Sequence, residues 1–244
     1  MRKLFTIWRR EMTACFLSPV AYVTMVVFLA MSGWIFLQMV EGNVGTSELL
    51  PALLFKVIIF FWLPILVAVI TMRLFAEEKR SGTIEALMTA PITETQVVLG
   101  KYFGALTFLL IVSVPAVASI FLLAFLSPGI DSVDIGAVLG GCLILFLVSG
   151  LCTSVGLFAS LMTRNQIIAA ICCFSGILLP LLAGHLISLL PVGSVEALEY
   201  ISATTHVPDF ARGSIDTRVI VPYLLGTAFV LFSAVRMLES RRWK

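Results

Sequence analysis

Long stretches without a charged side chain dominate this sequence of 244 residues. Residues 12–40, 102–130 and 135–163 contain no Lys, Arg, Asp or Glu. A charged group at the centre of a lipid bilayer costs about 3 kcal/mol, and a helix of about 20 apolar residues crosses the bilayer. The charge-free stretches therefore predict membrane-spanning helices.

We place six spans, near residues 20–40, 53–72, 101–126, 135–162, 166–190 and 219–238. Six spans use about half of the chain, so we expect residues 1–244 to form a single all-α membrane domain without an appended soluble domain. The sequence is 60% hydrophobic and 12% charged, whereas soluble domains contain about 25% charged residues. This composition excludes a soluble enzyme.

The Lys and Arg residues divide unevenly between the two sides of the predicted bundle. With both termini on the cytoplasmic side, 13 of the 16 lie inside, and only Lys56, Arg212 and Arg218 lie outside. Short cytoplasmic loops carry an excess of Lys and Arg. We therefore expect a multi-pass protein with cytoplasmic N- and C-termini.

Residues 1–17 precede the first predicted span and contain apolar side chains at helical spacing, among them Phe5, Trp8, Met12 and Phe16. The basic residues lie mostly elsewhere around the helix. This pattern predicts a helix in the membrane interface, with a simple basic anchor for topology as the alternative.

The sequence offers little chemistry within the bilayer. No Asp or Glu falls inside the six spans, and the two histidines, His185 and His206, do not suit a shared haem because His185 is expected near the outer interface. The five cysteines are expected to be small packing residues. Lys56 is expected to reach the head groups, with a substrate-binding role as the alternative. We predict no catalytic residue, cofactor site or metal site.

The sequence also lacks the pattern G-x-x-x-x-G-K-[ST], in which backbone amides bind nucleotide phosphates. We therefore expect that the chain is not itself an enzyme. Any ATP and Mg would be bound by another subunit, and nucleic acid is not an expected partner because no basic segment with interleaved aromatic residues stands out.

The link between the second and third predicted spans, residues 73–100, is the most informative segment. It contains EEKRSGTIEALMTAPIT from Glu77 to Thr93. Ser81 and Gly82 permit a sharp turn, and the residues after them place Ile84, Leu87 and Met88 on one side of a short helix. A capping box formed by Thr93 and Gln96 is predicted to begin the next helix.

Such a short amphipathic helix suits docking on a soluble motor protein. The alternative is an interfacial helix that contacts only lipid or the termini of the chain itself.

This link resembles the signature of ABC-2 type transporter permeases, the membrane subunits of transporters driven by separate ATP-binding cassette ATPases. The resemblance extends to SPVAYV at Ser18–Val23, FARGSIDTR at Phe210–Arg218 and LESRRW at Leu238–Trp243. These strings are similar to the gliding-motility-associated branch, although the resemblance does not imply motility. A permease that accompanies copper-enzyme maturation is the alternative within the superfamily, but no external segment rich in Met or Cys supports it.

The resemblance implies six spans, an interfacial helix before the first span, and a coupling helix at residues 82–88 in a cleft of the ATPase. It also implies short helices in the outer leaflet over residues 191–217. The residues that would couple to the ATPase are Glu77, Glu78, Gly82, Thr83, Ile84, Glu85, Leu87 and Met88.

The resemblance further implies a bacterial inner-membrane complex of two ATPase chains and two permease chains, either identical or related. An auxiliary membrane protein with an external domain is a further expected partner. Two functions remain open: ATP-driven export, and mechanotransmission to an external partner without movement of substrate. An ATP-independent channel or carrier is the third hypothesis, and the absence of carboxylates within the spans argues against it.

Overall fold

The computed structural model describes residues 2–41, 49–83, 92–126, 134–187 and 203–241, and this part of the chain is helical without a β-strand. Its elements are α1 (Arg2–Leu17), α2 (Pro19–Glu41), α3 (Leu49–Val57), the π-helix η1 (Ile58–Trp62), α4 (Leu63–Thr71), α5 (Ala76–Ser81), α7 (Glu94–Leu126), α8 (Ile135–Met162), α9 (Gln166–Ile187), α11 (Ala203–Phe210) and α12 (Thr217–Arg241). The all-α prediction is confirmed for these residues.

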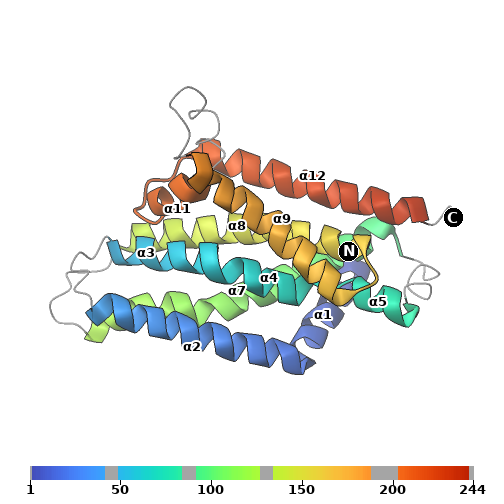
Figure 1. Ribbon diagram of the computed structural model, residues 1–244, viewed down its shortest axis with the longest axis horizontal. Coiled ribbons are helices and arrows are strands. Elements are labelled where there is room, and N and C mark those ends of the chain that lie inside the picture. The colour runs from blue at the N-terminus through green and yellow to red at the C-terminus, as the bar shows by residue number, and fades with distance from the viewer. Residues whose placement is uncertain (1, 42–48, 84–91, 127–133, 188–202, 242–244) are drawn as a thin grey trace.

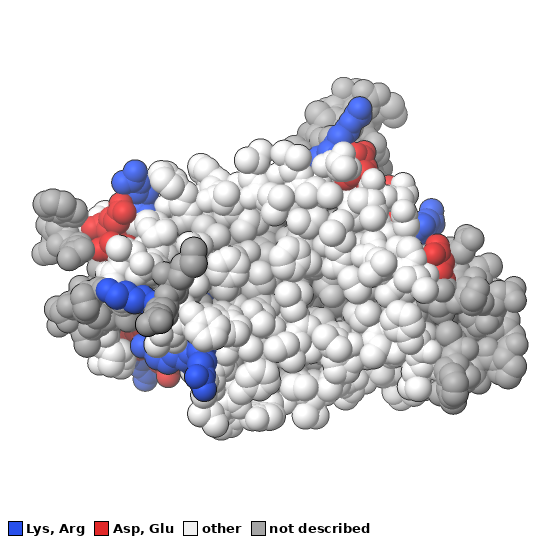
Figure 2. Space-filling model, turned by 180° about the vertical axis from the view of Figure 1, so that it is seen from behind, with Lys and Arg blue, Asp and Glu red and all other residues white. Residues whose placement is uncertain are grey.

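The long helices run side by side along the long axis of the molecule (Figure 1). Helices α1 and α5 and the end of α12 lie at one end of the bundle, here called the α5 end, and α11 lies at the other, the α11 end (Figure 1). Figure 2 shows the Lys, Arg, Asp and Glu side chains gathered at the two ends, with an uncharged band between them. This distribution is that of a multi-pass membrane protein.

Five of the predicted spans fall on the helices α2, α7, α8, α9 and α12, and the second falls on α3, η1 and α4. Residues 188–190 of the fifth predicted span lie outside the described residues. Within the described residues, four helical stretches are long and apolar enough to cross a membrane: Pro51–Ser81, Glu94–Leu122, Ile135–Met162 and Thr217–Ser240. Helices α1 and α2, bent by 70° with respect to each other, would together make a fifth, and α9 contributes the shorter apolar helix Gln166–Leu181. A bundle of several spans is thus present, and the count of six stays a prediction.

Helix α8 lies at the centre of the bundle, where it packs against α4, α7, α9 and α12. Small residues on α8 permit this close packing. A Cβ atom added at Gly141 would strike the ring of Phe55, and one at Gly156 would strike the hydroxyl of Thr71. These small residues therefore let α3 and α4 approach α8 closely.

The second predicted span contains a feature that the sequence does not reveal. Residues Ile58–Trp62 form a π-helix between α3 and α4, and Pro64 lies in the first turn of α4, which begins at Leu63. Proline is tolerated there because the first turn of a helix has unpaired backbone donors.

Candidate functional site

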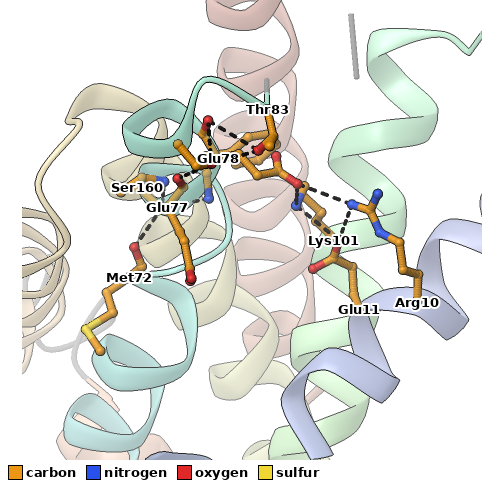
Figure 3. Close-up of polar contacts among 11 residues, drawn as sticks. Arg10, Glu11, Met72, Glu77, Glu78, Thr83, Lys101 and Ser160 are labelled. Carbon is orange, nitrogen blue, oxygen red and sulfur yellow. Dashed lines mark hydrogen bonds and ion pairs between the residues drawn. The ribbon is translucent and has the colours of Figure 1, made fainter. Parts of the chain in front are cut away.

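Four charged side chains from three helices meet at the α5 end of the bundle (Figure 3). The ammonium group of Lys101, on α7, donates to Oε1 of Glu78 over 2.8 Å and to Oε1 of Glu11 over 3.1 Å. The guanidinium group of Arg10 donates to the same two carboxylates, over 2.8 Å to Glu11 and 3.2 Å to Glu78. We call this group the charge cluster: Arg10, Glu11, Glu78 and Lys101.

The charge cluster is largely removed from solvent at its centre. Lys101 is only 1% exposed, and its ammonium group lies 5.1 Å from the centroid of the buried Phe75 ring. A buried charge is tolerated when oppositely charged groups bind it. The two cations and two carboxylates balance each other, so the cluster links α1, α5 and α7 without an excess charge.

Two glycines of α7 position Glu11 beside Lys101. Helix α1 packs closely on α7: a Cβ atom added at Gly100 would lie 2.7 Å from Ile7, and one at Gly104 would lie 2.8 Å from Cβ of Glu11. The indole of Trp8 also donates to the hydroxyl of Thr107 over 3.1 Å. A helix is confirmed over Arg2–Leu17, and its position in the membrane interface stays a prediction. The face of α1 that packs on α7 includes Ile7 and Glu11, whereas Phe5 is exposed.

Helix α5 is attached to α8 through Ser160. The backbone amides of Phe75 and Ala76 donate to the Ser160 hydroxyl oxygen over 3.0 and 3.1 Å, and this hydroxyl donates to the carbonyl of Met72 over 3.3 Å. The ammonium group of Lys79 donates to the carbonyl of Leu161. The bonds to Ser160 satisfy the backbone amides of Phe75 and Ala76, which have no partner within α5.

The residues of the predicted coupling segment fall partly within the structure. Glu77 and Glu78 lie on α5, and Gly82 ends this helix with a φ of 74°, a left-handed conformation that favours glycine. The hydroxyl of Thr83 lies 2.9 Å from that of Ser81. Ile84, Glu85, Leu87 and Met88 lie outside the described residues.

Arg10, Glu11, Lys101 and Ser160 are not among the site residues that the sequence predicts. The available signal was an acidic residue within a basic N-terminal helix and a lysine at the start of an apolar stretch. Glu11 and Lys101 are 90 residues apart in the sequence, so only the packing of the helices brings them together. The sequence also shows Glu77–Arg80 only as a charged approach, whereas these residues belong to helix α5.

A second feature lies on the membrane-spanning part of the chain. A cavity of about 460 Å³ lies between α3, η1, α4 and α9. We call it the aromatic cavity, and its walls include Lys56, Phe60, Phe61, Phe174 and Leu178. Its volume is within the range of small-molecule sites, about 300–1,000 Å³.

Of the two histidines, His206 is buried and packs edge-on against Tyr223, with 6.2 Å between ring centroids. The side chain of His185 lies outside the described ones. Burial lowers the pKa of His206, and the nearby carboxylates of Asp209 and Asp216 oppose this effect. Among the residues that the structure describes, there is no group of three or more His, Cys, Asp or Glu side chains that could hold a metal ion.

Comparison with protein families shows which family the chain matches. The model of a family described as ABC-2 family transporter protein matches residues 11–180, more than half of the chain. This range includes the charge cluster except Arg10, and it includes the aromatic cavity except Leu181. No curated protein matches the chain.

Proposed function

Because this chain belongs to the ABC-2 family of transporter proteins, we propose that it is the permease subunit through which a separate ATPase drives export across a bacterial inner membrane. Membership of the family makes the chain a membrane component of an ATP-binding cassette transporter, with an ATPase as its general partner. The charge cluster supports the finer proposal, because it joins α5, which leads into the predicted coupling segment, to α1 and α7.

The proposed coupling begins at residues 82–88, which dock on the ATPase. Movement of this segment passes through Gly82 to α5. From α5 it reaches α8 through Ser160, and α1 and α7 through the ion pairs of Glu78. ATP drives the permease only if the ATPase interacts differently with two states of the bundle. We propose that α5 moves together with α1 and α7 between these states.

The α5 end is the proposed cytoplasmic side. Helices α1 and α5, at this end (Figure 1), carry Lys3, Arg9 and Arg80, among others. Of the basic residues assigned to the other side, Lys56 lies on α3, Arg212 lies just after α11, and Arg218 lies at the start of α12. An excess of Lys and Arg in short loops supports a cytoplasmic position. In the proposed orientation, the predicted docking segment lies on the side where ATP is available. We further propose that the ATPase supplies all nucleotide binding, since the sequence lacks a phosphate-binding loop.

The aromatic cavity favours export over mechanotransmission. A subunit that only transmits force requires no ligand-sized space within its membrane part, whereas a transported molecule does. Mechanotransmission to an auxiliary protein with an external domain is the second candidate. The complex is proposed to contain two permease chains, identical or related, and two ATPase chains.

Affinity purification of the full chain from its native membrane in mild detergent tests this proposal. We expect an ATP-binding cassette ATPase at one copy per permease chain. Recovery of an external-domain protein in equal amount would favour mechanotransmission. Recovery of the chain alone, under conditions that preserve other transporters, would overturn the proposal and favour a channel or carrier.

A further inference from the structure

A cavity of about 390 Å³ opens beside the charge cluster, in the angle between α1 and α2. Helices α4, α5 and α7 supply its other walls. We call it the elbow pocket, and its walls include Ser18, Ala21, Ile70, Arg73, Glu77 and Phe108. The 70° bend between α1 and α2 separates the two helices enough to form this space.

The elbow pocket presents one positive and one negative group beyond the charge cluster. The guanidinium of Arg73 donates a hydrogen bond to the hydroxyl of Ser18. Among the described residues, neither Arg73 nor Glu77 takes part in an ion pair. Glu77 is exposed, and Figure 3 shows its carboxylate turned away from the contact between Glu78 and Lys101. Both groups are therefore available to a ligand.

The charge cluster and Thr24 also line the pocket, and the remainder of its wall is apolar. Ala21, Ile70 and Phe108 line it below the charged groups, and the neighbouring surface of α2 exposes Tyr22 and Val23. The pocket thus has charged groups at the α5 end of the molecule and an apolar wall that leads toward the uncharged band. This is the arrangement of a phospholipid at the membrane surface, with its head group outside and its acyl chains inside.

We propose that the elbow pocket binds one phospholipid with a phosphoethanolamine head group. The phosphate lies at Arg73, whose planar guanidinium matches phosphate oxygens, and the ammonium group lies at Glu77, whose carboxylate accepts hydrogen bonds from it. An acyl chain follows the wall formed by Ala21, Ile70 and Phe108. This site goes beyond the proposed transport function and does not depend on it, since lipid binding requires no ATPase.

The two charged groups predict which lipid is selected. A choline head group carries three methyl groups on its nitrogen and donates no hydrogen bond to Glu77. A phosphoglycerol head group has no cation to place there. Phosphatidylethanolamine is therefore expected to be retained over phosphatidylcholine and phosphatidylglycerol by about tenfold, the usual effect of one charge-assisted hydrogen bond.

Native mass spectrometry of the full chain tests the site. The chain is reconstituted in vesicles containing phosphatidylethanolamine, phosphatidylglycerol and phosphatidylcholine in equal amounts, then extracted in mild detergent. Wild-type protein is expected to retain one phosphatidylethanolamine per chain. Arg73→Gln is expected to lower this retention about tenfold, while Arg236→Gln, an arginine outside the pocket, leaves it unchanged.

Glu77→Gln distinguishes head-group recognition from general lipid binding. It is expected to remove the preference, so that phosphatidylglycerol is retained as well as phosphatidylethanolamine. Because Glu77 is exposed, this variant keeps the test decisive if Arg73→Gln fails to fold. Equal retention by wild type and Arg73→Gln, or an unchanged preference in Glu77→Gln, would overturn the site. Displacement by equimolar glycerophosphoethanolamine would overturn its assignment to a lipid.

Discussion

Lys101 and Glu78 lie 23 residues apart in the sequence, and their ion pair, 2.8 Å long, joins the helix after the predicted coupling segment to the helix before it. In the sequence, residues 84–91 lie between Glu78 and Lys101. The same lysine also binds Glu11 of α1. A force on the coupling segment therefore acts on a position where three helices are held together.

Replacing Lys101 by Met should destabilise the chain. The change leaves Glu11 and Glu78 without their shared buried partner, and breaking a buried ion pair costs about 3–5 kcal/mol. Thermal unfolding in detergent measures the effect. Lys56→Met, at an exposed lysine outside the cluster, is the matched control. A Lys101→Met protein as stable as this control would show that the charge cluster does not hold the helices together.

The attachment of α5 to α8 makes a separate prediction. Ser160→Ala removes the acceptor for the amides of Phe75 and Ala76, and leaving buried donors unpaired costs about 1–3 kcal/mol. Faster hydrogen exchange at these two amides is the expected result. Ser175→Ala is the control, because that exposed serine bonds only within its own helix. Unchanged exchange at Phe75 and Ala76 would contradict the role of Ser160.

The close packing of α1 on α7 predicts opposite effects for two similar substitutions. Alanine is favoured over glycine by about 1 kcal/mol inside a helix, so Gly33→Ala, where nothing lies within 4 Å of the new Cβ atom, should not destabilise the chain. Gly104→Ala should destabilise it, since the new Cβ atom would lie 2.8 Å from Glu11. Melting temperatures of the two variants compare the effects. Equal melting temperatures would mean that α1 moves away from α7 without cost.

The positions of the long helices could be predicted because the absence of charge is a local property of the sequence. The end of α1 at Leu17 was likewise marked by the change from an amphipathic pattern to an apolar one, with Pro19 at the start of α2. The four-residue spacing of Gly100 and Gly104 is typical of a close helix contact, but it does not identify α1 as the partner helix.

The charge cluster could not be predicted in the same way. Glu11 and Lys101 stand at the boundaries of apolar stretches, where charged residues are ordinary, and only the packing of α1 on α7 brings them together. The hydroxyl of Ser160 accepts hydrogen bonds from two backbone amides, those of Phe75 and Ala76, a role that its place in an apolar stretch does not indicate. The π-helix at Ile58–Trp62 has no signal that periodicity detects.

The proposed coupling to the ATPase is tested most sharply by placing a charge within the predicted coupling helix. Leu87→Asp is compared with Ile215→Asp, an exposed apolar residue near the α11 end, by measuring how much ATPase co-purifies and how far the permease stimulates its activity. We predict that Leu87→Asp loses the ATPase while the permease stays folded, and that Ile215→Asp keeps it. Full recovery and stimulation of the ATPase by Leu87→Asp would contradict the proposed coupling.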